Sequence, residues 1–342
     1  MYMLMLQSIA SSKWYTSTRA MKTNRLQLLP LIIVMGLCGL LWAKQQEIQD
    51  WWKLRDYTPP TAVVQLANED TMKPYTRHLF YLNKPQLPTT VDSFRKDCPE
   101  NEDTIVLGCY HTGQNGIFIY AVQDSTLAGI QQVTAAHEVL HAVYARLSDS
   151  ARKTLDSELE SYYKHGLTDP NVKAEVALYQ KTEPGSVYDE MSCTFGTEIA
   201  DLPSALNAYY SQFFTNRQKI VAYEQQYQGQ FTSRQQQIAA YDARLAAMKT
   251  QIDDQENNLA TASANLNSEH DQLQQELSTG QVGAYNAAVA SYNSQVDTYN
   301  QQVSSLRAQI AAYNQLVSIR NSVAGQLTTL ASAIDTRLLS AP

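Results

Sequence analysis

The longest regular pattern in this chain is a seven-residue repeat of apolar side chains that begins near residue 220. From there the composition shifts to Gln, Asn, Ala and Ser, and apolar residues recur at alternating steps of three and four or at whole heptads, as in a coiled coil. Gly280 and Gly283 interrupt the repeat and mark a reversal point. Gln- and Asn-rich stretches also occur in disordered chains, but the sustained repeat predicts an antiparallel coiled-coil hairpin over residues 218–342. The apolar positions of its two arms are Ile238, Tyr241, Leu245, Met248, Ile252, Leu259, Leu266 and Leu273, then Tyr285, Val289, Tyr292, Val296, Tyr299, Val303, Leu306, Ile310, Tyr313 and Val317.

An apolar stretch near the amino terminus predicts attachment to a membrane. Residues 26–43 read LQLLPLIIVMGLCGLLWA, eighteen residues without a charge and just long enough to cross a bilayer. Four basic residues and no acidic residue precede it. The positive-inside rule therefore predicts that residues 1–25 lie in the cytoplasm and that the chain after Lys44 lies outside. The alternative is secretion after cleavage of a signal peptide, although the residues before Lys44 lack a small-x-small cleavage pattern. Translation from Met21 is an open alternative to Met1.

One short motif is typical of metal chemistry. His137, Glu138 and His141 form the pattern His-Glu-x-x-His, within a run that contains no proline from residue 126 to residue 147. On a helix, residues four apart share a face, so both imidazoles can bind one metal ion. The carboxylate of Glu138 can then act as general base on a water that the metal holds. The alternative is a core helix with two incidental histidines and a solvated glutamate.

The uncharged residues on both sides of the motif strengthen this interpretation. Together with the motif, they resemble the active-site helix of the zincin metallopeptidases. The resemblance covers about residues 100–215 and implies a peptidase that binds Zn²⁺ and hydrolyses a peptide or protein substrate. It implies that His137 and His141 bind zinc. It also implies that Glu138 accepts a proton from the attacking water and later donates one to the leaving amine.

Zinc needs a third protein ligand. No Gly and His follow at the spacing of the metzincin branch. The chain is instead similar to the gluzincin branch, whose third ligand is a Glu on a second helix, often in a Glu-x-x-Ala-Asp run. Glu190 matches that Glu, while Cys193 and Thr194 stand where the run has Ala and Asp, so no Asp is expected there to orient a ligand. Glu198 is the competing candidate, roughly 12 Å further along a helix. We expect Glu190 to be the ligand.

A small β-sheet is expected before the motif. Residues 77–82 and 104–107 are short strand candidates, and Asn115-Gly116 between apolar residues predicts a hairpin within residues 108–122. The zincin resemblance implies that an edge strand of this sheet pairs with extended substrate, and residues 113–120 are the candidate. After the motif, residues 149–164, a segment opened by Pro170, the Glu190 segment and residues 204–217 are predicted to be helices.

Transition-state stabilisation needs a further hydrogen-bond donor near the scissile carbonyl. The sequence does not choose between that role and core packing for the candidates Tyr188, Tyr209, Tyr210 and Arg217.

Composition limits the partners. The net charge of −7 and the lack of a basic stripe argue against nucleic acid. Four cysteines are present. Cys98 and Cys109 can form a disulfide if their region lies outside the cytoplasm, and two buried free thiols are the alternative.

These observations predict a mostly α protein with an α+β catalytic domain. The expected parts are a cytoplasmic segment (1–25), a transmembrane anchor (26–43), a juxtamembrane linker (44–75), a zincin-like metallopeptidase domain (76–217) and the coiled-coil hairpin (218–342). We expect a membrane-anchored zinc metallopeptidase that acts outside the cytoplasm. The hairpin would serve as a spacer, for self-association or for contact with other envelope proteins. The alternatives are a non-catalytic envelope scaffold and a zinc amidase that acts on a non-protein amide.

Overall fold

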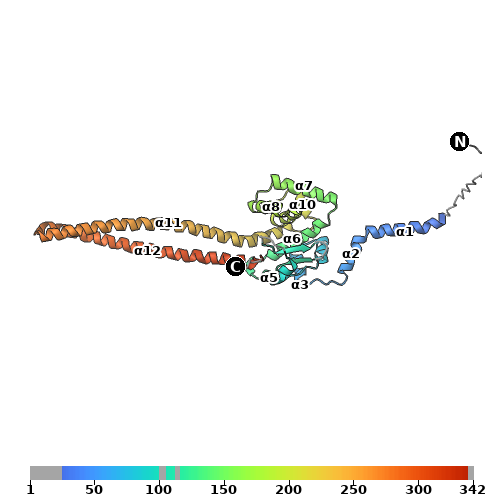
Figure 1. Cartoon of the computed structure of the whole chain (residues 1–342), viewed down its shortest axis with the longest axis horizontal. Coiled ribbons are helices and arrows are strands. Elements are labelled where there is room, and N and C mark those ends of the chain that lie inside the picture. Colours follow the sequence, from blue (N-terminus) through green and yellow to red (C-terminus); the bar gives the residue numbers. More distant parts are fainter. Residues whose placement is uncertain (1–24, 100–104, 112–115, 338–342) are drawn as a thin grey trace, which may run out of the picture. The chain divides into compact units, whose positions relative to one another are not determined.

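The structure is a computed structural model that describes residues 25–99, 105–111 and 116–337. It divides into two compact units, one up to Tyr57 and one from Thr58 onward. The described part is mostly helical and contains a two-stranded sheet, as predicted (Figure 1).

The first unit contains helices α1 (Arg25–Ala43) and α2 (Gln45–Leu54). The side chains of Trp51 and Trp52 on α2 are more than half exposed. Within the part of the chain that the structure describes, no helix is both long enough and apolar enough to cross a bilayer.

Most of residues 44–75, the segment predicted as a juxtamembrane linker, form helices. Residues 45–54 are α2, and α3 (Thr61–Glu69) packs against the motif helix in the second unit. Val63, Leu66 and Ala67 on α3 are buried at helical spacing. Only the short segment around Pro59 remains an irregular connection between α2 and α3.

The predicted strand over residues 77–82 is wrong, because these residues belong to helix α4 (Pro74–Leu82). Pro74 occupies the first turn of α4, where its fixed φ and missing N–H suit a helix start. Thr76, Leu79 and Phe80 are buried at steps of three and four, which gives one apolar helix face. Residue 104 lies outside the described residues, and residues 105–107 are not a strand.

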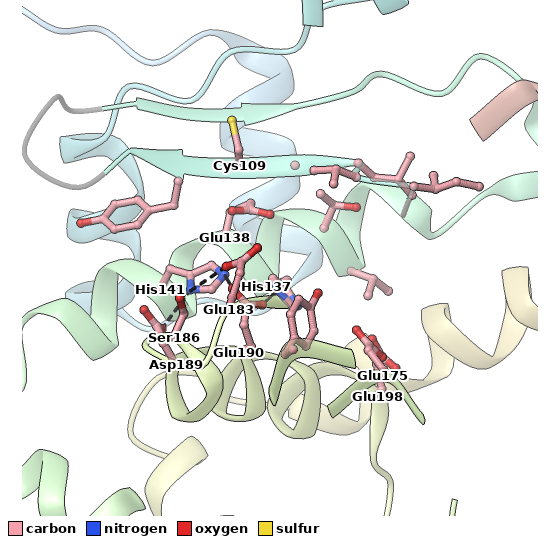
Figure 2. A pocket seen from close by; sticks show the side chains of 18 of the residues that line it. Cys109, His137, Glu138, His141, Glu175, Glu183, Ser186, Asp189, Glu190 and Glu198 are labelled. Atoms are coloured by element: carbon pink, nitrogen blue, oxygen red, sulfur yellow. Dashed lines mark hydrogen bonds and ion pairs between the residues drawn. The ribbon is translucent and has the colours of Figure 1, made fainter. Parts of the chain in front are cut away.

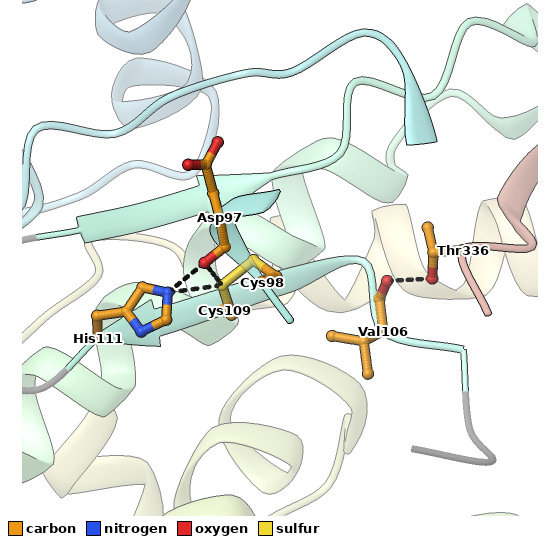
Figure 3. Close-up of a disulfide and its surroundings, with 6 residues drawn as sticks. All are labelled: Asp97, Cys98, Val106, Cys109, His111 and Thr336. Atoms are coloured by element: carbon orange, nitrogen blue, oxygen red, sulfur yellow. Dashed lines mark hydrogen bonds between the residues drawn. A yellow bond between two sulfur atoms is a disulfide. The ribbon is translucent and has the colours of Figure 1, made fainter. Parts of the chain in front are cut away.

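The predicted hairpin is present. Strand β1 (Gly108–His111) pairs antiparallel with β2 (Gly116–Ile119), and Cys109 lies opposite Phe118. Asn115 of the expected turn lies outside the described residues. Helix α5 (Val91–Asp97) is joined to β1 by the disulfide between Cys98 and Cys109 (Figure 3). Of the two alternatives left open by the sequence for Cys98 and Cys109, the structure has the disulfide rather than two free thiols.

Strand β2 is not a free edge, contrary to expectation. Its Ile117 N–H donates to Asn83 O, and its Ile119 N–H donates to Gln86 O, while Gln86 N–H donates to Ile117 O. Residues 83–86 therefore cover the side of β2 that faces away from β1. The part of the predicted substrate edge within residues 116–120 is already paired, and residues 113–115 lie outside the described residues.

The motif lies on a helix that four further α-helices follow in the chain before the carboxy-terminal region. The motif helix α6 (Ile130–Ala145) is preceded by a 3₁₀ turn (Ser125–Leu127) and is followed by α7 (Asp149–His165), α8 (Pro170–Thr182), α9 (Val187–Glu198) and α10 (Ser204–Tyr210). Each predicted helix is present, although α10 stops seven residues earlier than expected. Gly129, with φ of 105°, makes the sharp entry into α6. Helix α9 packs along α6 and brings its residues to the motif.

The carboxy-terminal region forms the predicted helical hairpin. Helix α11 (Arg217–Ser278) and helix α12 (Val282–Ile334) lie side by side (Figure 1). Arg320 on α12 pairs with Asp242 on α11 at 2.8 Å, and the rings of His270 and Tyr292 approach each other nearer the turn. Both pairs fit one antiparallel register, because their residue numbers have the same sum. Gly280, with φ of 76°, lies in the turn between the arms.

The base of the hairpin belongs to the second unit. Leu330 near the end of α12 packs with Val122, Leu127 and Ile130. Just beyond α12, Thr336 Oγ1 donates to Val106 O at 2.6 Å (Figure 3). Arg95 Nε donates to Thr336 O. These contacts hold the returning end of the hairpin against the segment that leads into β1.

Candidate metal centre

The motif histidines lie one turn apart on α6 and project to one side. Their ring centroids are 5.1 Å apart. Most of α6 is buried, and its uncharged residues, such as Ala135, Ala136 and Val139, are 0% exposed, so packing on several sides fixes the helix. The His137 and His141 side chains retain 19% and 11% exposure, which leaves their nitrogens reachable from the adjoining pocket.

Glu190 on α9 faces both histidines. Its Oε2 lies 3.6 Å from His137 Nε2, and its Oε1 lies 3.7 Å from His141 Nε2 (Figure 2). Zinc binds such atoms at about 2.0–2.1 Å in a tetrahedral arrangement, which places neighbouring ligand atoms about 3.4 Å apart. The two distances from Glu190 to the histidines are close to this value, so these donor types and separations are compatible with a zinc ion after small shifts.

The electrostatics around Glu190 suit a ligand. Burial by itself raises the pKa of its carboxyl group, but the hydrogen bond from His137 and the charges of the two histidines outweigh burial and lower the pKa below its ordinary value. Glu190 is therefore ionised at neutral pH, which is the form that binds a metal ion.

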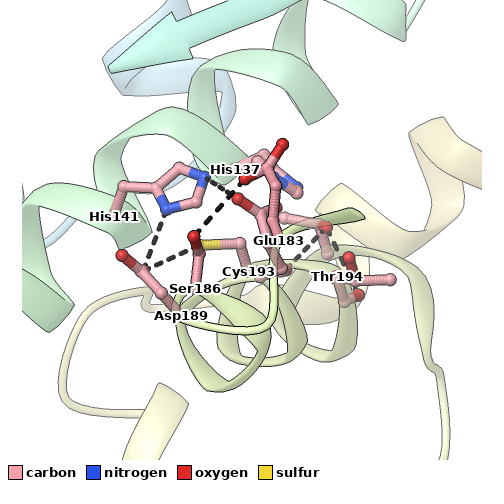
Figure 4. Close-up of polar contacts among 9 residues, drawn as sticks. His137, His141, Glu183, Ser186, Asp189, Cys193 and Thr194 are labelled. Atoms are coloured by element: carbon pink, nitrogen blue, oxygen red, sulfur yellow. Dashed lines mark hydrogen bonds and ion pairs between the residues drawn. The ribbon is translucent and has the colours of Figure 1, made fainter. Parts of the chain in front are cut away.

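Two neighbours orient His141. Its Nδ1 lies 2.9 Å from Asp189 Oδ1, so Nδ1 can donate to the carboxylate while Nε2 points at Glu190 (Figure 4). Tyr110 on β1 stacks on the His141 ring, with an interplanar angle of 4° and centroids 6.3 Å apart. A carboxylate on the outer nitrogen of a metal-binding histidine fixes its tautomer and raises its basicity.

Glu138 lies under β1. Glu138 is 5% exposed, and its side chain forms part of the pocket wall (Figure 2). A Cβ added at Gly108 would collide with the Glu138 carboxylate and would come within 2.6 Å of Thr134 Cγ2. Gly108 thus allows the strand to approach the helix closely, and the close packing holds the Glu138 carboxylate against β1 at the wall of the pocket.

Cys193 is a further candidate ligand. From the sequence alone it is recognised only as a residue that follows Glu190, not as a ligand. One ligand atom each from His137, His141 and Cys193 lie within 4.8 Å of one another. However, burial raises the pKa of the Cys193 thiol to about 12, so it keeps its proton at neutral pH. The ionised Glu190 is the better donor.

Glu198, the competing third ligand, lies elsewhere. It is near Glu175 and Glu224 rather than near the histidine pair, and Figure 2 shows it beside Glu175. The α9 backbone places Glu190 and Glu198 about two turns apart, as expected from their spacing.

The candidate metal centre opens into a pocket of about 510 Å³, a size that holds small ligands or part of a peptide. Residues 105–110 line one wall, so the pocket runs along β1 and the segment before it. Residues of α6, α8, α9 and α11 and of the segment between α8 and α9 line the remainder.

The four predicted oxyanion candidates do not line this pocket. Tyr210 donates to Ser192 O, and Arg217 donates to Ile199 O and Ala200 O, so both hold the fold together. Tyr188 and Tyr209 also lie outside the pocket wall. The tyrosines that do line it are Tyr110, Tyr179 and Tyr227, which the sequence did not single out because they come from three distant segments.

A second cluster of metal-type side chains is explained by other bonds. Cys98, Cys109 and His111 lie together, but the two sulfurs form the disulfide, and His111 Nε2 is hydrogen bonded to the backbone oxygen of Asp97 (Figure 3).

Comparison with known proteins identifies no relative. No family model matches the chain, and no curated protein and no solved structure is significantly similar to it.

Proposed function

We propose that this protein is a zinc metallopeptidase of gluzincin type. The observation that carries the proposal is the position of Glu190, which lies within 3.7 Å of both motif histidines although it is some fifty residues away in sequence. A helix with two incidental histidines has no need for an ionised, buried carboxylate opposite both Nε2 atoms. His137, His141 and Glu190 would hold the metal.

The chain supplies the rest of the chemistry. Zinc, when bound, acts as a Lewis acid and makes hydroxide available near neutral pH. Glu138 accepts the proton of the attacking water and then transfers it to the leaving amine. Asp189 and Tyr110 hold His141 in one orientation while this occurs.

An extended peptide is the substrate class that the pocket favours. Strand β1 lines the pocket, and the far side of β2 is already paired with residues 83–86. Substrate backbone would therefore pair with β1 rather than with the predicted residues 113–120. This geometry favours a peptide over a non-protein amide.

Location outside the cytoplasm is also part of the proposal. The disulfide between Cys98 and Cys109 supports it, because disulfides persist in oxidising compartments. The charge-free residues 26–43 would anchor the chain in a membrane, with residues 1–25 in the cytoplasm. The long hairpin of α11 and α12 would contact envelope partners or a second copy.

The test is hydrolysis of internally quenched peptides by the full-length protein. We expect cleavage that a zinc chelator abolishes and that added zinc restores. The variant Glu138→Gln should lose about 10²–10⁴-fold in kcat/KM, which is the usual contribution of a general base. Glu158→Gln, on the exposed face of α7, is the matched control and should retain activity. Equal activity of wild type and Glu138→Gln would refute the mechanism, and a non-catalytic scaffold would then be the better account.

A further inference from the structure

The pocket wall just before β1 is held by the far end of the hairpin. Residues 105–107 line the pocket but do not form a strand. Thr336, two residues beyond the last residue of α12, donates from Oγ1 to Val106 O at 2.6 Å (Figure 3). The neighbouring Leu107 O accepts from the N–H of Tyr120 at 2.8 Å. Two successive carbonyl oxygens of this wall are therefore fixed, one by the residue after β2 and the other by Thr336.

Thr336 is itself held in place. It is only 6% exposed, and its backbone oxygen accepts a hydrogen bond from Arg95 Nε at 2.6 Å. Arg95 lies on α5, which the disulfide between Cys98 and Cys109 joins to β1. Thr336 thus connects α5, the pocket wall and the end of α12.

The base of the hairpin also contributes to the pocket. Tyr227 on α11 lines it, as does Leu107 from the wall. Both side chains pack against an apolar cluster that contains Leu330 of α12 and Ile130, the first residue of the motif helix. Both arms of the hairpin therefore meet the pocket wall and the start of α6 in one cluster. The pocket is formed by residues on both sides of residue 217, the expected end of the metallopeptidase domain.

We propose that Thr336 is a positioning residue for substrate binding, which holds residues 105–107 in the place where an extended peptide meets the pocket wall. This inference rests on the proposed peptidase function, because it assigns the wall of the same pocket to substrate. A segment that must be ordered when a peptide binds costs free energy and weakens binding, and a segment that is already fixed avoids this cost. Thr336 is not among the residues that line the pocket, so its effect is on substrate binding through the wall rather than on the chemical step.

The test removes the hydroxyl of Thr336. Thr336→Val keeps a branched side chain but takes away the donor to Val106 O, whereas Thr336→Ser restores a donor. Thr328→Val is the matched control, because Thr328 is exposed on α12 and its hydroxyl donates within that helix, to Ala324 O.

Hydrogen exchange of the full-length protein measures the wall directly. The exchange rate of residues 105–111 is compared with that of α7, because a general loss of stability would accelerate exchange in both segments. We expect this ratio to rise at least about fivefold in Thr336→Val, the usual effect of losing one hydrogen bond. Thr336→Ser and Thr328→Val should match the wild type.

Hydrolysis kinetics then measure the effect on substrate. With internally quenched peptides, Thr336→Val should raise KM at least about fivefold and leave kcat within about twofold of the wild type, because the wall binds substrate without touching the reacting atoms. Thr336→Ser should restore KM. Zinc content should be the same in all variants.

The outcomes distinguish this inference from the proposed function. An unchanged exchange ratio in Thr336→Val would overturn the positioning role, whether or not the wild type hydrolyses peptides. An unchanged KM in Thr336→Val, with a wild type that does hydrolyse peptides, would also overturn it. A raised exchange ratio in a protein whose wild type hydrolyses nothing would retain Thr336 as the residue that positions the wall and would reject the peptidase.

Discussion

His141 Nδ1 lies 2.9 Å from the carboxylate of Asp189, the residue immediately before the proposed zinc ligand Glu190. One turn of α9 therefore contributes both the carboxylate that faces the metal position and the one that orients a histidine. The gluzincin-like run predicted no orienting carboxylate, because Thr194 stands where the family has Asp. Under the proposed function, Asp189 would take that role from the other side of Glu190 through its contact with His141.

Asp189→Asn should weaken zinc binding by about 10–100-fold, the usual effect of removing a partner of a metal-binding histidine. The amide is similar in size but cannot supply the negative charge that raises the basicity of His141. Competition with a zinc-sensitive dye measures the affinity. Asp149→Asn, on exposed α7, is the control, and equal affinities of the two variants would show that Asp189 does not act through His141.

Gly108→Ala should reduce kcat/KM by at least about tenfold, because an added Cβ would collide with the Glu138 carboxylate and with Thr134. Gly185→Ala is the matched control, since nothing lies within 4 Å of the corresponding Cβ. The measurement is peptide hydrolysis together with zinc content, which should not change in either variant. Full activity of Gly108→Ala would mean that β1 does not position Glu138.

Much of the fold follows from local patterns. The heptads predicted both arms of the hairpin, and the His-Glu-x-x-His spacing alone places His137 and His141 on one face. The prediction of a strand over residues 77–82 was wrong because their aromatic and branched side chains also suit a strand. These residues instead belong to helix α4, which begins at Pro74 and buries residues at steps of three and four.

The remaining features of the site depend on contacts between distant segments. Residues 83–86 cover β2, and no local pattern shows this pairing. The position of Asp189 depends on how α9 packs on α6. The sequence suggests both Glu190 and Glu198 as third ligands. Only the packing of α9 on α6 shows that Glu190 faces the histidines and that Glu198 does not.

The disulfide should make a measurable contribution to stability. Replacing both Cys98 and Cys109 by Ser should lower the free energy of unfolding of the second unit by about 2–4 kcal/mol, mainly because the unfolded chain gains freedom. Denaturant unfolding followed by circular dichroism measures the change. Cys38→Ser is the control, because that cysteine is exposed and unpaired. An unchanged unfolding midpoint in the double variant would contradict the pairing.

Stability of the metal-free protein should fall as pH rises from about 5 to about 7. Burial raises the pKa of Glu224 to about 7, from an ordinary value near 4.3 in the unfolded chain. Between these values the folded protein retains a proton that the unfolded chain releases, so stability that is full below about pH 4.3 is lost as pH approaches 7.

Glu224→Gln removes this titration while keeping the shape of the side chain. Its melting temperature should therefore fall less than that of the wild type between pH 5 and pH 7.5 in the presence of a chelator. Parallel pH profiles for the two proteins would show that Glu224 does not retain a proton in the folded state.

The central claim is that His137, His141 and Glu190 hold one zinc ion, and metal analysis of the purified full-length protein tests it most directly. The expected result is close to one zinc per chain in the wild type and in Glu198→Gln, and little zinc in Glu190→Gln. A wild type that binds no zinc, or a Glu190→Gln variant that retains it fully while Glu198→Gln loses it, would contradict the account.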